Sequence, residues 1–262
     1  MKRFFVLLVI VALIFILSGC IWGEKPLLKI ALIDDSHANR FGEEESEFFD
    51  GIIAILASKE YEYRYSSAVG FEPQNYAIVI LSMPSASYST SDIDKLKTQL
   101  TKKGKIIMMD MLVEIPPAST FFLDALSDGL NTGIGFVWGL VTDTVNNIGG
   151  NKMMITSDNF TTHPLASSLS AKIAMMMATK LTVEGNATVA IFAESSAIFT
   201  TYVPSGDEVT YVPQAPAPIP IVVTSNIGGG KVVAISSAYA FHGTLMGIVP
   251  GNTDLFEAVV DW

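Results

Sequence analysis

The residues best suited to chemistry follow short apolar runs that are typical of buried strands. Asp34, Asp35, Ser36 and His37 come directly after the run that ends at Ile33. Because the carboxyl ends of parallel strands meet at one edge of a sheet, polar residues after other runs are expected at the same edge. The sequence therefore predicts a polar pocket there. Its candidate ligand-binding residues are Asp35, Ser36, His37, Asp110, Ser237 and His242.

Metal binding is one chemistry that these residue types allow. Asp35 and His37 could join His242 or Asp110, because two imidazoles with one or two carboxylates suit zinc or another divalent ion. The spacing Asp-x-His is not diagnostic of such a site. A purely structural alternative is that Asp34 or Asp35 caps the following loop while His37 packs against Phe41. We assign no catalytic residue, metal ion or cofactor from the sequence.

Hydrolysis by a serine nucleophile is the other chemistry that these residues could support. The candidates would be Ser36 or Ser237 as nucleophile, His37 or His242 as base, and Asp35 or Asp110 as orienting acid. The chain has no Gly-x-Ser-x-Gly turn, which would expose a serine on a strained bend. Hydrolase or metal-dependent activity is therefore kept as the alternative to a non-catalytic function.

Strands and helices alternate in the first half of the chain. The helix expected over 43–59 begins with acidic residues, which suit the positive end of the helix dipole. A second helix is expected from a cap at Ser89 or Ser91 to Lys103, with Gly104 as its stop. A third is expected over 117–126, opened by proline. This alternation predicts a mostly parallel sheet with helices on both faces. The expected strands are 27–33, 61–65, 76–81 and 105–109.

The second half is richer in expected strands. A hairpin is expected around Asn226 to Gly230, between apolar runs at 221–224 and 231–236. The proline-rich segment 205–220 is expected to be an exposed loop, and 253–262 a closing helix. The remaining expected strands are 135–142, 153–156, 172–177, 189–193 and 199–203.

Several motifs together resemble one known family. They are Ile33-Asp34-Asp35-Ser36-His37-Ala38-Asn39-Arg40-Phe41, Gly104-Lys105-Ile106-Ile107, His163-Pro164-Leu165, Gly229-Gly230-Lys231-Val232-Val233-Ala234-Ile235-Ser236, and the closing segment 256–262. Their order and spacing resemble the class I glutamine-amidotransferase-like domains of exported and membrane-anchored prokaryotic proteins. The resemblance covers 28–262.

The resemblance implies a single flavodoxin-like α/β sandwich, with a mostly parallel sheet and a strand-rich second half. Members of the family with glutaminase activity carry a nucleophilic cysteine at a turn after a central strand. The comparable turn here is Asp110-Met111-Leu112, and Cys20 is the only cysteine of the chain. Without a thiolate for acyl transfer, we do not expect glutamine amidotransferase activity.

The amino-terminal segment is typical of a lipoprotein signal. Lys2 and Arg3 precede an apolar run, and 17–20 reads Leu-Ser-Gly-Cys, which resembles a bacterial lipobox. The resemblance implies cleavage before Cys20 and lipidation of its thiol, palmitate included. The expected organisation is a signal peptide at 1–19, a lipidated tether at 20–27 and the domain at 28–262. An uncleaved transmembrane anchor is the alternative. With either kind of anchor, the domain is expected on the extracytoplasmic face of the cell membrane.

The charge balance excludes one class of partner. The chain holds 16 basic and 26 acidic residues, for a net charge of −10. An acidic surface repels nucleic acid. The sequence thus predicts a membrane-anchored, non-catalytic module that binds a small polar ligand such as a sugar, or a protein of an envelope or transport complex.

Overall fold

The protein is described by a computed structural model that places residues 27–113, 118–205, 208–215 and 217–262. Its largest sheet holds seven strands among these residues, in the order β11-β14-β15-β4-β3-β1-β2. Five neighbours, from β15 to β2, pair in parallel, and β14 and β11 are added by antiparallel pairing. The strands are β1 (Leu28–Asp34), β2 (Glu62–Tyr65), β3 (Tyr76–Ser82), β4 (Lys105–Met109), β11 (Thr188–Phe192), β14 (Pro220–Ile227) and β15 (Gly230–Ile235).

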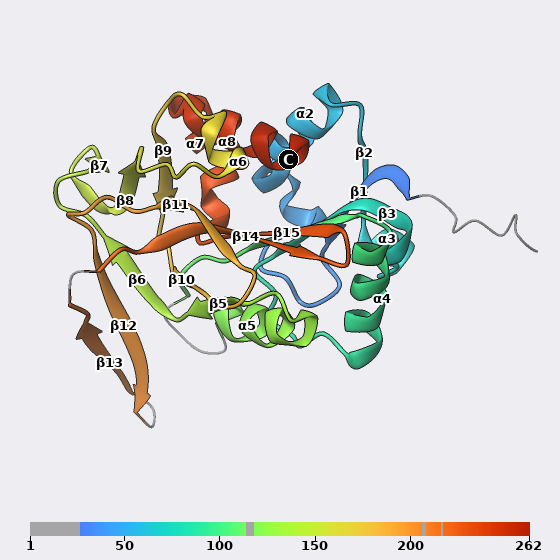
Figure 1. Ribbon diagram of the computed structural model, residues 1–262, viewed down its shortest axis with the longest axis horizontal. Coiled ribbons are helices and arrows are strands. Elements are labelled where there is room, and N and C mark those ends of the chain that lie inside the picture. Colours follow the sequence, from blue (N-terminus) through green and yellow to red (C-terminus); the bar gives the residue numbers. More distant parts are fainter. Residues whose placement is uncertain (1–26, 114–117, 206–207, 216) are drawn as a thin grey trace, which may run out of the picture.

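Helices cover both faces of this sheet (Figure 1). In the middle strands successive residues enter opposite cores: Ile107 and Met109 face one, and Ile106 and Met108 the other. This alternation follows from the two-residue period of a strand, and buried strands carry apolar residues on both faces. One face packs on α2 (Asp50–Ser58), α7 (Gly243–Ile248) and α8 (Pro250–Asp261), and the other on α4 (Thr90–Thr101) and α5 (Ser119–Leu130).

The described residues also form several short helices. They are α3 (Ser66–Val69), α6 (Pro164–Ser167) and the 3₁₀ helices η1 (Glu43–Phe49), η2 (Pro73–Asn75) and η3 (Ala238–Phe241). No helix in the described part of the chain has the length and apolar character needed to cross a bilayer. The predicted signal peptide, Cys20 and nearly all of the tether fall on 1–26, outside the described residues.

Three smaller antiparallel sheets lie in the long segment between β4 and β15. They combine β10 (Lys180–Val183) with β5 (Ile134–Val137); β13 (Glu208–Pro213), β12 (Ile198–Ser205) and β6 (Gly139–Thr142); and β7 (Asn147–Ile148), β8 (Asn151–Ser157) and β9 (Ile173–Met176). The predicted α/β class with a mostly parallel main sheet and a strand-rich second half is confirmed. A single sandwich does not describe the whole chain, because these three sheets are added to the main sheet and pack into the same two cores.

Several predicted elements differ in their limits. The helix expected over 43–59 is interrupted at Glu45, which has non-helical dihedrals (φ −105°, ψ 41°), so η1 and α2 replace it. The helix expected over 117–126 instead spans Ser119–Leu130 and ends at Asn131 in the left-handed region (φ 55°). Asparagine tolerates that conformation better than most residues.

The strand expected over 135–142 is broken at Trp138, and its second half begins at Gly139, where φ is 157°. A Cβ on Gly139 would lie 2.3 Å from the carbonyl oxygen of Thr200, so only glycine fits this crossing. The two halves, β5 and β6, belong to different sheets.

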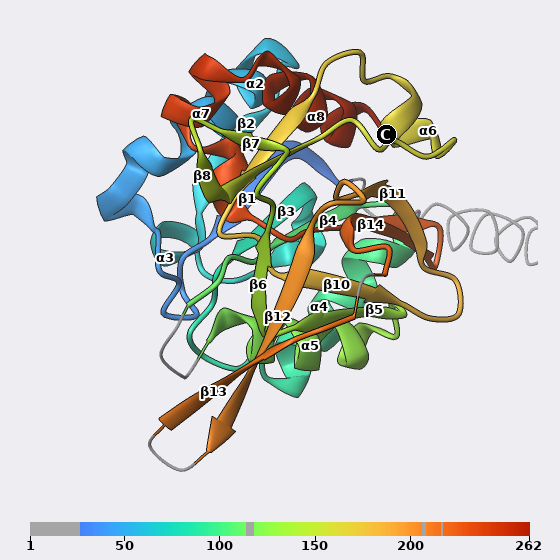
Figure 2. The ribbon, with the colours of Figure 1, turned by 90° about the vertical axis from the view of Figure 1, so that its left-hand side faces the viewer.

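The loop expected over 205–220 is wrong at Glu208–Pro213, which form strand β13. Proline cannot donate to a strand ladder, but it is accepted at the end of an edge strand. Pro213 ends β13, and β13 is the edge of its sheet. Figures 1 and 2 show the β12–β13 hairpin projecting from the body of the molecule.

Candidate functional site at the strand ends

The parallel strands end at one edge of the main sheet, as the sequence predicts. Asp34 ends β1 and Ser82 ends β3, while Asp110 and Ser236 directly follow β4 and β15. The chain order reverses between β1 and β3, since β1 lies between β2 and β3. In open α/β sheets ligands bind outside the strand ends at such a reversal. Asp34 and His37 lie at this point.

Asp34 is fully buried, and its carboxylate accepts hydrogen bonds from several side chains. Ser36 Oγ donates at 2.8 Å, Ser66 Oγ at 2.9 Å and Tyr88 Oη at 2.8 Å. His37 Nδ1 lies 2.9 Å from its Oδ2. Burial alone would raise the pKa of Asp34, but the hydrogen bonds and the charge of His37 outweigh burial and hold it below its usual value.

The imidazole of His37 contacts carboxylates through both of its nitrogens. Nδ1 faces Asp34, and Nε2 lies 3.6 Å from Asp92 Oδ2 at the start of α4. Burial acts to lower the pKa of His37, but hydrogen bonding to Asp34 and the charges of Asp34 and Asp92 raise it above its usual value. The ring also packs between Tyr88 and Phe71, with centroids 4.0 and 4.8 Å away. His37 therefore links the loop after β1 to α4, between two carboxylates that favour its charged form.

Ser36 is not arranged as a nucleophile. In a hydrolase triad the serine and the acid bind opposite nitrogens of the histidine. Here Ser36 Oγ lies 3.3 Å from Nδ1 of His37, the same nitrogen that Asp34 binds, and donates to Asp34 at 2.8 Å. Nε2 faces a carboxylate instead of a hydroxyl. Neither nitrogen is free to take a proton from Ser36.

Asp35 points toward the junction of β2 and α3. Its carboxylate accepts bonds from Ser66 Oγ at 3.0 Å and from the Ser67 N–H and Oγ at 2.7 Å each. It also lines a shallow pocket of about 440 Å³, together with Arg40, Gly42 and Ser67. The structural alternative is that Asp34 or Asp35 caps the loop. These contacts fit it, because each carboxylate accepts a hydrogen bond from a nearby backbone N–H group. His37, however, packs on Tyr88 and Phe71, whereas Phe41 stacks on Phe48.

Asp110 is fully buried beside the first turn of α5. Ser119 Oγ, Thr120 Oγ1 and Thr179 Oγ1 donate to its carboxylate at 2.5, 2.8 and 3.0 Å. Burial raises the pKa of Asp110, although these hydrogen bonds oppose the shift. Its position is the one where the resemblance places a nucleophile, but a carboxylate enclosed by three hydroxyls is closed to a substrate.

Ser237 and His242 follow the last parallel strand but turn to other partners. Ser237 Oγ donates to the carbonyl of Met176 at 2.6 Å. His242 Nδ1 accepts from the Thr244 N–H at 3.2 Å, which caps α7, and its ring stacks on Tyr239 with centroids 4.6 Å apart. The N–H of Ala238 donates to the backbone carbonyl of Asp110, so these strand ends are adjacent.

The structure thus divides the six predicted residues into sets that do not meet. In the described part of the chain, no hydrogen bond, ion pair or ring contact joins His37 to Asp110, Ser237 or His242. The described part of the chain also holds no group of three or more His, Cys, Asp or Glu side chains that could bind a metal ion. Sequence reasoning missed the partners Ser66, Tyr88 and Asp92; only Asp92 had a local signal, three residues after the cap Ser89.

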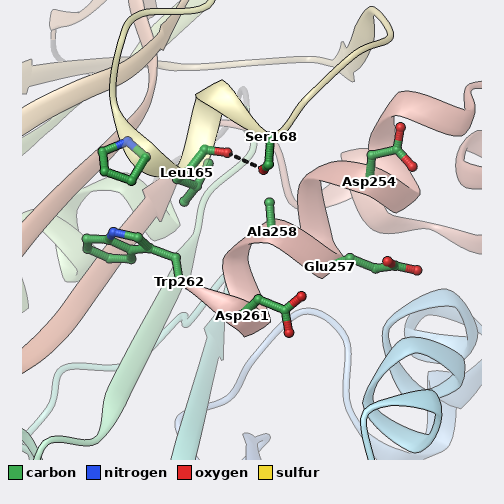
Figure 3. Close-up of a pocket in the computed structure, with 8 residues that line it drawn as sticks. Leu165, Ser168, Asp254, Glu257, Ala258, Asp261 and Trp262 are labelled. Atoms are coloured by element: carbon green, nitrogen blue, oxygen red, sulfur yellow. Dashed lines mark hydrogen bonds between the residues drawn. The ribbon is translucent and has the colours of Figure 1, made fainter.

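A second pocket lies between α6 and α8 (Figure 3). It measures about 390 Å³, and Asp254, Glu257, Asp261 and Trp262 form its wall. Lys59 partly neutralises it, with Nζ 2.7 Å from Asp261. None of the predicted site residues lines this pocket.

Comparisons with known proteins identify the fold. Neither a protein-family model nor a curated protein matches this sequence. Among solved structures, the mmIFT52 N-terminal domain is similar, with a TM-score of 0.66 and 14% identity over 89% of this chain and 96% of that chain. The cytoplasmic protein STM3548 from Salmonella typhimurium gives a TM-score of 0.48 and 13% identity, covering 89% and 98%. At 14% identity the likeness to the mmIFT52 domain concerns the fold alone.

Proposed function

We propose that this protein is a non-catalytic assembly module held outside the cytoplasm by a lipid on Cys20, and that it docks a protein of an envelope or transport complex. We also propose that its domain is flavodoxin-like and related to the class I glutamine amidotransferases. The order β2-β1-β3-β4-β15 of the parallel strands supports this relation, because flavodoxin-like sheets have the order 2-1-3-4-5. Asp110 then occupies the place of the missing cysteine.

The observation that carries the proposal is that Asp34, Ser36, His37 and Asp110 at the strand ends all have partners within the protein, whereas the Ser82 hydroxyl is buried there without one. Asp34, His37 and Ser36 form one hydrogen-bonded cluster, and Asp110 is enclosed by hydroxyl donors. Buried polar groups with this degree of satisfaction specify and stabilise a fold. A hydrolase, or a ligand held jointly by Asp35, His37 and His242, fits this geometry less well.

The β12–β13 hairpin supports a docking function. It extends from the body while exposing apolar side chains: Val203 is 43% exposed, Tyr211 58% and Val212 41%. Its base is anchored, because Tyr202 packs edge-on against Trp138, with centroids 5.6 Å apart. By the strand register Val203 and Val212 lie on one face of the hairpin and Tyr211 on the other, so this projecting element exposes apolar side chains on both faces. β13 is also a sheet edge, whose outer backbone groups can pair with another chain.

The position of the hairpin suits an anchored protein. β1 begins at Leu28, which directly follows the proposed tether, at the right of Figure 1. The hairpin lies at the lower left of the same view, on the far side of the molecule. A lipid on Cys20 would therefore leave the hairpin directed away from the membrane and accessible to a partner.

Native gel electrophoresis of the full chain extracted from its own membranes tests this proposal. We expect the wild type to migrate in a discrete assembly larger than one chain, and the double variant Val203→Ser, Tyr211→Ser to migrate alone. Val145→Ser is the matched control, since Val145 is 72% exposed on another loop. Migration of the wild type as a single chain, or an assembly that both variants retain, would contradict docking through the hairpin.

A further inference from the structure

A pocket beside edge strand β2 has the features of a binding site that the strand-end cluster does not have. It measures about 450 Å³ and lies between β2 and the residues Glu43, Ala57 and Ala68. Three tyrosines, Tyr61, Tyr63 and Tyr65, contribute to its wall. Ligand pockets typically combine aromatic walls with a few polar groups, as this pocket does. Strand β2 is the outermost strand of the main sheet on the side away from β11.

The hydroxyl of Tyr65 is the first indication of a ligand. Tyr65 is only 6% exposed, and its oxygen is buried without a hydrogen-bond partner. A buried hydroxyl without a partner is unfavourable, so such groups are rare and call for an explanation. Burial, with the nearby Tyr63 and Asp35, raises the pKa of Tyr65 to about 12. The group therefore remains a neutral hydroxyl that can both donate and accept.

The rings of Tyr63 and Tyr61 supply flat apolar surfaces. Tyr63 lies on the same face of β2 as Tyr65, two residues away, with ring centroids 5.8 Å apart and planes at 87°. It is 37% exposed and lines the pocket. Tyr61 has the ammonium of Lys29 5.4 Å from its centroid, so a charged partner already occupies part of its surroundings.

The pocket carries both positive and negative side chains, so it does not favour a ligand of one charge. Arg64 Nη2 lies 2.9 Å from Glu62 Oε2, and Glu43 adds a carboxylate on the other wall. These groups offer both donors and acceptors to a neutral ligand. Arg64 Nη1 also donates to the Tyr63 carbonyl at 2.8 Å. Because that carbonyl on the sheet edge is partnered, the addition of a peptide strand to β2 is disfavoured.

We propose that this pocket binds a neutral saccharide, with a pyranose ring on Tyr63 and a sugar hydroxyl hydrogen-bonded to Tyr65. A pyranose has an apolar C–H face that packs on an aromatic ring and hydroxyls that donate and accept at its rim. Those are the properties of the partly exposed ring of Tyr63, the buried hydroxyl of Tyr65 and the Arg64–Glu62 pair. The site is separate from the hairpin, so it stands or falls independently of docking.

Saturation-transfer NMR on the full chain tests the saccharide site, in a detergent that has no sugar headgroup. The probes are cellobiose, maltose and di-N-acetylchitobiose at about 10 mM, since single saccharide contacts give millimolar affinity. We expect at least one of them to receive saturation from the protein. No transfer to any of the three probes would overturn the proposal, and so would binding of a peptide to the same pocket in their place.

Two tyrosine variants and a control then locate the binding. We expect Tyr63→Ala to weaken the affinity about tenfold, because the stacking surface is lost, and Tyr65→Phe about fivefold, because one hydrogen bond is lost. Phe121→Ala is the matched control, since Phe121 is an exposed aromatic residue (43%) on α5 that does not line this pocket, and it should bind like the wild type. Unchanged affinity in both Tyr63→Ala and Tyr65→Phe would place the saccharide elsewhere and overturn the assignment.

Discussion

The strand-end cluster and the β2 pocket both hold polar side chains withdrawn from water, and they differ in how these are partnered. Tyr88 Oη donates to Asp34 at 2.8 Å, within a network that also includes His37 and Ser66. Tyr65 is equally buried, but its hydroxyl has no partner in the described part of the chain. The carboxylates and the imidazole at the position favoured by topology are therefore partnered within the protein, although Ser82 Oγ at the end of β3 is not, and the pocket beside edge strand β2 is the better candidate for a ligand.

Replacing Asp34 should produce the largest effect. Asp34→Asn removes the charge that His37 and three hydroxyls surround, and we expect the free energy of unfolding to fall by about 3 kcal/mol, as when one partner of a buried ion pair is lost. Urea denaturation measures it. Asp94→Asn, on the exposed face of α4, should change stability by less than about 0.5 kcal/mol.

An Asp34→Asn variant as stable as the Asp94→Asn control would mean that the cluster does not support the fold. The strand ends would then again be open to a ligand or to chemistry.

The two buried tyrosines allow a matched comparison. Tyr88→Phe takes a donor from a buried carboxylate and should cost about 2 kcal/mol. Tyr65→Phe removes a hydroxyl that has no partner, and should leave the unliganded protein unchanged or more stable by up to about 1 kcal/mol. Thermal and urea unfolding of both variants measure the difference. Equal losses in the two variants would show that Tyr65 has a partner and would remove the contrast.

The pH dependence of stability should report the His37–Asp34 pair. The pKa of His37 is raised, so its contribution is complete below its unfolded value near 6.5 and is lost as the pH rises through the folded value. The pKa of Asp34 is lowered, so its contribution is present above an unfolded value of 3.8 and is lost as the pH falls. Relative to His37→Gln, wild-type stability should therefore be greatest between these two values and decline in alkali.

A difference between wild type and His37→Gln that stays constant from pH 5 to pH 9 would contradict the raised pKa of His37, since a group whose pKa differs between the folded and unfolded states must give a slope.

The hairpin should show the smallest effect on stability. Val203→Ser with Tyr211→Ser removes exposed side chains, and we expect a change within about 0.5 kcal/mol, as for other surface substitutions. Urea denaturation of the purified variant checks this. A large loss would mean that the hairpin supports the body of the protein, and the loss of an assembly could then no longer be assigned to docking.

The sequence predicted most of the main sheet because its signals are local. Apolar runs followed by polar residues identified β1, β3 and β4, and the glycines at 228–230 identified the β14–β15 hairpin. Ser89 was a predicted helix cap, and its side chain accepts from the N–H of Asp92. These features depend on residues a few positions apart, so a single sequence reveals them.

The candidate site was less predictable because its contacts are distant in sequence. Asp34 meets Ser66 across 32 positions and Tyr88 across 54, and no local pattern announces either pair. Topology correctly brought Asp34, Asp110 and Ser237 to one edge. It could not show that each side chain turns to a separate partner, because that depends on side-chain packing. Strand β13 was missed because proline at a strand edge resembles proline in a loop.

The central claim is that His37 is a structural residue held between the carboxylates of Asp34 and Asp92, and not a base. Nitrogen-15 NMR of the His37 ring in the folded full chain tests it most directly. We expect both ring nitrogens to be protonated at neutral pH, with a pKa above the usual value near 6.5. A ring with one protonated nitrogen at neutral pH, titrating at or below 6.5, would contradict the account, because the free nitrogen could then accept a proton from Ser36.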